Sequence, residues 1–135
     1  MSDDGKTNGL PGAGISRLRD LRRKLLHLHK SLLDMERADF EKMFGSVNSG
    51  ELLQLVINGT QFAWLRRISA LVVEVDEILD QDEPAKLSDR EDLITQVRRL
   101  LTSPEDEEFG AKYQAALQRQ PTVVMNHAEV MKLLR

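Results

Sequence analysis

The sequence predicts an all-α fold, a bundle of about five helices, one of them short, with up-and-down-like connections. Apolar residues recur at steps of three and four along most of the chain. No alternating polar and apolar run is long enough to indicate a strand. Apolar residues make up 41% and charged residues 30% of the composition, which is typical of a globular protein.

We expect one helical domain over residues 15–135, preceded by a disordered tail over residues 1–14. The whole chain has 135 residues, the length of one ordinary domain. The tail contains four glycines and a proline among polar residues, so it has little to pack against a core.

The first helix is predicted to begin after Ser16, a good N-cap, and to end near Gly45. Residues on the flank of its apolar seam, Leu26, Leu33 and Phe40, widen the stripe and favour burial among several helices. The seam itself has the spacing of a coiled coil and consists of Leu18, Leu21, Leu25, Leu28, Leu32 and Met35.

Two helices are expected in the middle of the chain. Ser49 is the predicted cap of a short helix that ends at Asn58 and Gly59. Thr60 is the predicted cap of a longer helix, which we place at the centre because it is apolar over much of its circumference. Its main stripe is Trp64, Ile68, Leu71, Val75 and Ile78.

Three further helices are predicted from their start signals. Ser88 with Glu91 forms a capping box, Ser103 precedes a proline and two acids, and Pro121 can occupy the first position of the last helix. The expected core face of the first of these helices is Ile94, Val97 and Leu101, and that of the second is Phe109, Tyr113, Ala116 and Leu117. The last helix has an expected core stripe of Val124, Ala128 and Met131 and a neighbouring stripe of His127, Met131 and Leu134.

Several classes of chemistry are excluded or lack a motif. The chain has no cysteine, so disulfides, thiolate zinc sites, iron–sulfur clusters and thiol nucleophiles are impossible. The segment Gly12-Ala13-Gly14 is not followed by the lysine and hydroxyl residue of a phosphate loop, and no nucleophile elbow occurs. We therefore predict no catalytic residue and no cofactor, and expect a non-enzymatic protein.

A metal-binding helical bundle is one alternative. Histidine is the commonest metal ligand, and His29 lies about two turns before Glu36 on one helix face. A bundle could bring these two side chains together with His127 of the last helix. The Glu-x-x-His pairs that are typical of diiron bundles do not occur, which counts against this alternative.

The charges divide the chain into a basic and an acidic part. The stretch from Glu74 to Asp92 contains nine acidic residues and only two basic ones. Nucleic-acid binding by the residues of the basic patch is a second alternative to protein–protein contacts. The same residues can instead pair with the acidic stretch, either between two copies of the chain or within one chain, which is the arrangement we favour. The basic patch consists of Arg17, Arg19, Arg22, Arg23 and Lys24.

A partner surface is predicted around Phe62, Trp64 and Arg66. Aromatic and arginine side chains often dominate the binding energy of interfaces, and Trp64 is the only tryptophan. The favoured alternative is that Trp64 closes one end of the core.

Three short motifs carry a resemblance to known proteins: Leu28-His29-Lys30, Phe62-Ala63-Trp64-Leu65, and the six residues from Ala116 to Pro121. The chain after Gly14 resembles short, uncharacterised all-helical bacterial proteins. The resemblance implies a helical fold and a bacterial cytoplasm, and it implies no active site.

Residues 1–14 lack the cationic start and apolar core of a secretory signal, and no apolar stretch approaches the roughly 20 residues of a membrane span, so a cytoplasmic protein is expected. We expect it to act through protein–protein contacts, as a homodimer or as a regulatory or adaptor partner, using the leucine seam of its first helix and the Trp64 region.

Overall fold

The computed structural model describes residues 11–81 and 87–135. Within these ranges the chain is helical and contains no strand, so the predicted all-α class is confirmed for this part of the chain. The two described ranges contain six α-helices, compared with the roughly five expected, and one short 3₁₀ helix. Their bounds are α2 Pro11–Phe44, α3 Ser49–Asn58, the 3₁₀ helix η1 Ala63–Leu65, α4 Arg66–Leu79, α5 Leu87–Thr102, α6 Glu107–Arg119 and α7 Pro121–Leu133.

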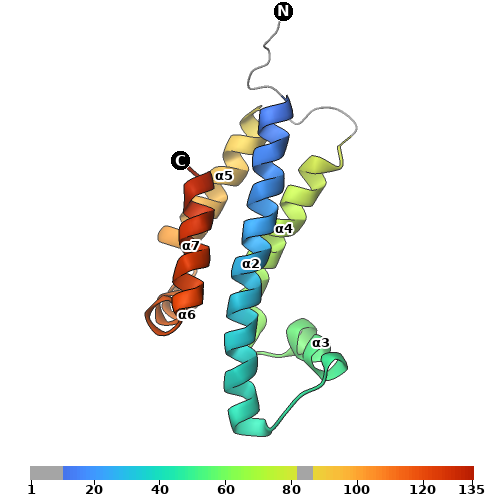
Figure 1. The fold of residues 1–135 in the computed structure, drawn as a ribbon, viewed down its shortest axis with the longest axis vertical. Helices are drawn as coiled ribbons and strands as arrows, with labels where there is room; N and C mark the ends of the chain where they lie inside the picture. The colour runs from blue at the N-terminus through green and yellow to red at the C-terminus, as the bar shows by residue number, and fades with distance from the viewer. Residues whose placement is uncertain (1–10, 82–86) are drawn as a thin grey trace, which may run out of the picture.

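The long helix α2 is the axis of the molecule (Figure 1). Helices α4 and α7 pack along it, α5 contacts α4 and α6, and α6 contacts α7. Helix α3 lies beside the lower end of α2, and its main packing contacts are to η1. The core therefore lies between α2 and the helices that follow α3.

The predicted leucine seam of α2 is confirmed as the centre of the core. All six of its side chains are buried, together with Ile68 and Val75 of α4. Of the flanking residues, Leu33 and Phe40 pack against the core, but Leu26 is 39% exposed. The packing of α4 and α7 on α2 leaves the side of Leu26 in contact with solvent.

The start of α2 differs from the prediction. The helix begins at Pro11, five residues before the expected cap Ser16, so the last four residues of the predicted disordered tail are helical. A proline fits a first turn because its missing N–H has no partner there in any helix. The rest of the predicted tail, residues 1–10, lies outside the described residues.

The end of α2 is confirmed at Gly45. This glycine has a φ of 91°, and its N–H donates to the carbonyl of Glu41 at 2.9 Å. A positive φ is open to glycine at little cost, which is why the helix ends there.

Two predicted caps are displaced along the chain. Asn48, not Ser49, caps α3: its side chain accepts from the amide of Glu51 at 2.9 Å, and the Glu51 carboxylate accepts from the amide of Asn48 at 3.0 Å. Asp106, not Ser103, caps α6. Asparagine and aspartate are as good at this position as serine, so the sequence signal is ambiguous.

The first residues of α5 and α7 lie at or next to the predicted positions. Helix α5 begins at Leu87, one residue before the predicted cap Ser88. Helix α7 begins at Pro121 as predicted, with the proline in its first turn.

The predicted helix from Thr60 is divided in two. A turn precedes the 3₁₀ helix η1, and α4 starts only at Arg66. Phe62, Trp64 and Leu65 are buried in and beside η1. Three large apolar side chains at close spacing cannot share one face of a regular helix, whereas the tighter winding around η1 turns them into the core.

The faces predicted for α7 are confirmed only in part. Leu134, directly after the helix, is buried and Met131 packs against the core, as expected for the neighbouring stripe. Val124 and Ala128 are exposed, however, and Val123 and Val130 are buried instead. This helix is apolar on several sides, so the spacing of its residues allows more than one stripe, and packing against α2 and α6 selects among them. No helix of the described part of the chain has the length and apolar character needed to cross a membrane.

Candidate functional site

Helix α3 is rich in apolar residues, yet none of its side chains is buried. Leu53 is 57% exposed and Ile57 is 53% exposed. A helix with so broad an apolar face is normally enclosed by other elements. The five apolar residues of α3 are Leu52, Leu53, Leu55, Val56 and Ile57.

The inner side of α3 touches the core only lightly. Leu52, Leu55 and Val56 are partly buried against it. The outer side, which carries Leu53 and Ile57, has no such cover. The helix is thus attached along one edge and exposed along the other.

The end of α2 adds further apolar surface beside α3. Met43 is 76% exposed and Phe44 is 70% exposed. The ring of Phe44 lies 4.7 Å from that of Phe40, which lies 6.2 Å from that of Phe62 in the core. Aromatic side chains therefore form a continuous row from the core to the surface.

A groove of about 540 Å³ lies between the end of α2 and α3. Its apolar lining comes from Phe40 and Phe44 on one side and from Leu55 and Val47 on the other. Its remaining lining residues are Ser46, Glu51, Gln54, Asn58 and Gly59. Only one of the nine carries a charge.

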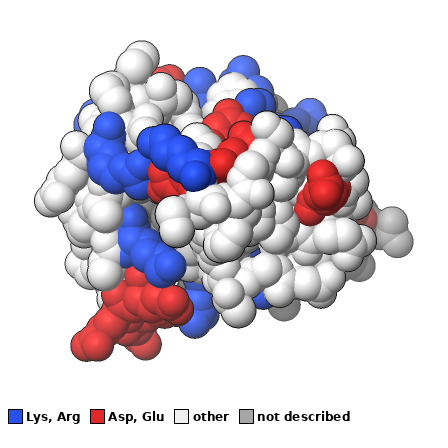
Figure 2. All heavy atoms as spheres, turned by 90° about the horizontal axis from the view of Figure 1, so that it is seen from below, with Lys and Arg blue, Asp and Glu red and all other residues white. Residues whose placement is uncertain are grey.

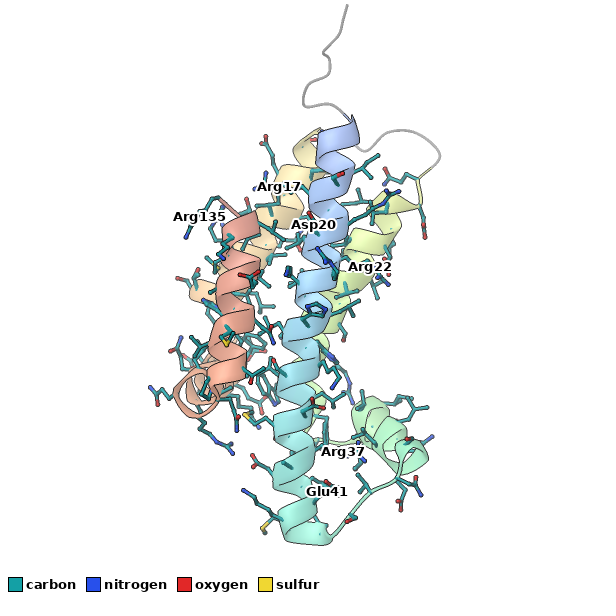
Figure 3. The ribbon with its side chains drawn as sticks, viewed as in Figure 1. Arg17, Asp20, Arg22, Arg37, Glu41 and Arg135 are labelled. Carbon is teal, nitrogen blue, oxygen red and sulfur yellow. The ribbon has the colours of Figure 1, made fainter. Side chains whose placement is uncertain are left out.

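Polar contacts hold the link between α2 and α3. Arg37 donates through Nη2 to the carbonyl of Val47 at 2.7 Å, and the Val47 amide donates to Oε2 of Glu41 at 2.9 Å. The two side chains also form an ion pair, with 3.7 Å between Nε of Arg37 and Oε2 of Glu41. Both lie on the lower part of α2 (Figure 3). The link is thereby tied to α2 through its backbone.

The other end of α3 is tied by Arg66. Its guanidinium donates to the carbonyl of Val56 at 3.3 Å and to that of Ile57. The amide of Gly59 donates to the carbonyl of Leu55 at 2.7 Å, and a Cβ at Gly59 would lie only 2.6 Å from that oxygen. Hydrogen bonds at both ends, rather than burial, thus fix the position of α3.

The surface around α3 carries little charge. Figure 2 shows the molecule from below, and the surface on the side of α3 is mostly white, with an isolated acidic patch in it. Within α3 itself, Glu51 is the only charged residue. This end of the molecule is therefore a largely apolar contact surface with little charge, which we call the α3 surface: α3, Phe44 and the groove between them.

The predicted partner residues around Trp64 have a different role. Phe62 and Trp64 are buried, which corrects the expectation that they anchor a partner and agrees with the alternative that Trp64 closes the core. Nε1 of Trp64 donates to Oε2 of Glu36 at 2.6 Å. Arg66 is exposed, but its guanidinium is engaged by the carbonyls of α3.

The predicted metal ligands are not assembled into a site. In the two described ranges, no three histidine, aspartate or glutamate side chains lie close enough together to hold a metal ion. The Glu36 carboxylate accepts hydrogen bonds from Trp64 and Gln61, and Nδ1 of His127 lies 2.7 Å from the hydroxyl of Tyr113. Burial lowers the pKa of both His29 and His127. This corrects the prediction of a site formed by His29, Glu36 and His127.

Much of the basic patch makes contacts within the chain. Arg17 donates to the carbonyls of Leu133 at 2.7 Å and Arg135 at 2.9 Å, at the end of α7 (Figure 3). Lys24 pairs with Glu129 of α7 at 3.2 Å.

Two further residues of the patch pair with acids. Arg22 pairs with Asp76 of α4 at 2.5 Å, which is the expected pairing with the acidic stretch inside one chain. Arg23 pairs with Asp20 on α2 itself at 3.0 Å, and Arg19 is exposed. Three residues of the patch, Arg17, Arg22 and Lys24, thus connect α2 to its neighbours, and nucleic-acid binding through the patch stays a prediction.

No protein-family model, curated protein or solved structure matches this chain. Function must therefore be inferred from the α3 surface and its surroundings. The sequence contains the signal for this surface, because Leu52, Leu53, Leu55, Val56 and Ile57 cover about 200° of the circumference of a short helix. The aromatic residues and the long leucine seam are the stronger contact signals in the sequence.

Proposed function

We propose that this chain is a non-enzymatic helical protein that acts through protein–protein contacts, with the α3 surface as its docking site. In this proposal α2, α4, α5 and α7 form an up-and-down bundle that presents α3 to a partner. The resemblance to all-helical bacterial proteins favours a bacterial cytoplasm as the setting.

The observation that carries the proposal is that α3 is apolar, firmly positioned and unburied. Soluble proteins rarely leave a contiguous apolar patch exposed unless it has a binding role. Full burial of one large apolar side chain stabilises an interface by about 1.5–3 kcal/mol. Phe44, Leu53 and Ile57 keep more than half of their surface available for this purpose.

The fixed position of α3 strengthens the proposal. The contacts of Arg37, Glu41 and Arg66 with the backbone on either side of α3 hold it without burying it. A surface that is ordered before binding loses less conformational entropy when a partner arrives. A docking element benefits from such an arrangement, whereas a helix that only stabilised the fold would be expected to face the core.

A photo-crosslinking experiment in the native cell tests the proposal. A benzophenone amino acid replaces Leu53 in one variant and, as a matched control, Val73 of α4 in another, because both side chains are more than half exposed. We expect the Leu53 variant to give a covalent adduct with a protein that mass spectrometry identifies, and the Val73 variant to give none. The absence of an adduct at Leu53, or equal adducts at both positions, overturns the proposal.

A further inference from the structure

Helix α3 carries two apolar features on different sides. Leu55 lines the groove beside α2, together with Glu51, Gln54 and Asn58. Leu53 and Ile57 each lie two residues from Leu55, which is about 200° around the helix. One side of α3 is therefore part of an apolar groove, and the opposite side is an apolar ridge.

Groove and ridge are alike in carrying little charge. The groove of about 540 Å³ combines the apolar side chains of Phe40, Phe44, Val47 and Leu55 with the uncharged polar side chains of Ser46, Gln54 and Asn58, and its only charged lining residue is Glu51. The ridge consists of the branched side chains of Leu53 and Ile57, and the part of α3 around it carries no charge. An uncharged helix face with two branched apolar side chains is the complement that such a groove requires.

The charge pattern argues against other occupants. The charged side chains of a strongly acidic or basic protein would be buried in this groove without ion-pair partners, which would cost binding free energy. An anionic membrane surface binds helices with lysine or arginine on their polar face, and α3 has neither. The chain itself, in contrast, carries the matching ridge.

The apolar side chains in contact with solvent are also concentrated here. Six large apolar side chains of the described residues are more than half exposed, and three of them, Phe44, Leu53 and Ile57, belong to the α3 surface. The three others, Met43, Val73 and Met125, lie on α2, α4 and α7. This concentration at one end favours a single interface over scattered surface residues.

We propose that the occupant of the α3 surface is a second copy of this chain. Leu53 and Ile57 of one copy lie in the groove of the other copy, and the reverse contact forms at the same time. This reciprocal arrangement is that of a two-fold dimer, in which both copies use the same surface. The inference rests on the proposed docking function and names its partner.

Cysteine pairs test this arrangement directly, because the chain has no cysteine of its own. Ile57→Cys on the ridge is mixed with Ser46→Cys at the groove under mild oxidation, and the control mixture replaces Ile57→Cys by Val73→Cys. We expect a mixed disulfide from the first mixture and only background from the control. Equal yields from both mixtures, or no mixed disulfide from the first, overturn the two-fold arrangement.

Size-exclusion chromatography with light scattering measures the same dimer without crosslinking. The unmodified chain is expected to be a dimer, and the double variant Leu53→Gln with Ile57→Gln should weaken dimerisation by at least about tenfold. Phe44→Gln tests the groove from α2 and should act in the same direction even if α3 were to unfold in the double variant. Val73→Gln is the control and should leave the dimer unchanged.

The outcomes separate the two proposals. A chain that stays monomeric at high concentration, or a dimer that neither variant weakens, overturns the second-copy inference. If the chain is monomeric but the benzophenone at Leu53 captures a different, identified protein, the docking function stands and only its partner changes. If no adduct forms at Leu53, both proposals fail.

Discussion

Glu36 and Trp64 are joined by a hydrogen bond of 2.6 Å inside the protein, from Nε1 of the indole to Oε2 of the carboxylate. Glu36 is the only charged residue that is buried in the described part of the chain. Its other oxygen accepts from Nε2 of Gln61 at 3.1 Å. The pair therefore joins α2 to η1, with which α3 is in contact, while Gln61 joins Glu36 to the turn between α3 and η1.

Replacing Glu36 with leucine should destabilise the protein, because the N–H of Trp64 then stays buried without an acceptor. An unsatisfied buried donor costs about 1–3 kcal/mol in the free energy of unfolding. Urea unfolding followed by fluorescence measures this directly, since Trp64 is the only tryptophan. Glu77→Gln, at an exposed position of α4, is the control and should change stability by about 0.5 kcal/mol or less. Similar effects of both variants would contradict the role of the pair.

Leu28 and Leu26 offer a comparison on the same helix. Leu28 is fully buried in the seam of α2, so Leu28→Ala should lower the free energy of unfolding by about 2–5 kcal/mol. Leu26 is 39% exposed, and Leu26→Ala should cost clearly less. Chemical denaturation of both variants at one temperature provides the test. The assignment of the buried face is wrong if the two losses are equal.

The ion pair between Arg22 and Asp76 is expected to contribute little to stability. The distance is 2.5 Å, but the two side chains are 42% and 41% exposed, so water and salt screen their attraction. Arg22→Ala should lower the free energy of unfolding by about 1 kcal/mol or less. A double-mutant cycle with Asp76→Ala at low and high salt measures the coupling. A large coupling that does not depend on salt would show that the pair is shielded from solvent.

The stability of the protein should fall as the pH decreases through the titration range of histidine. Burial lowers the pKa of His29 and His127 below the ordinary value of 6.5, so the unfolded chain binds protons more readily than the folded chain. Stability is then fully present above 6.5, decreases as the pH falls from 6.5 towards the folded-state pKa values, and levels off below them.

Two measurements check this pH dependence. Titration of the histidine ring signals by nuclear magnetic resonance should place the midpoints of His29 and His127 below 6.5. The double variant His29→Asn with His127→Asn should show a smaller loss of stability between neutral and mildly acidic pH than the unmodified chain. Midpoints at or above 6.5, or an unchanged slope, would contradict burial as the cause of the shift.

The α3 surface could be predicted from the sequence only in part. The bounds of the short helix were predicted to within one residue, because Asn58 and Gly59 end it and polar residues precede it. Its exposure could not be predicted, since Leu52, Leu53, Leu55, Val56 and Ile57 are the residues of a core helix by composition. The sequence instead indicated Trp64, which the 3₁₀ turn places in the core.

The sequence alone determined the all-α class, the buried seam of α2 and the glycine at which that helix ends. These features depend on local periodicity and on backbone preferences, which act through neighbours in the chain. Only the tertiary structure decided which side of α7 faces the core, whether Glu36 pairs with Trp64 or with a metal, and that α3 is left uncovered. Burial depends on which elements meet in space, and several helices of this chain have more apolar faces than the core can enclose.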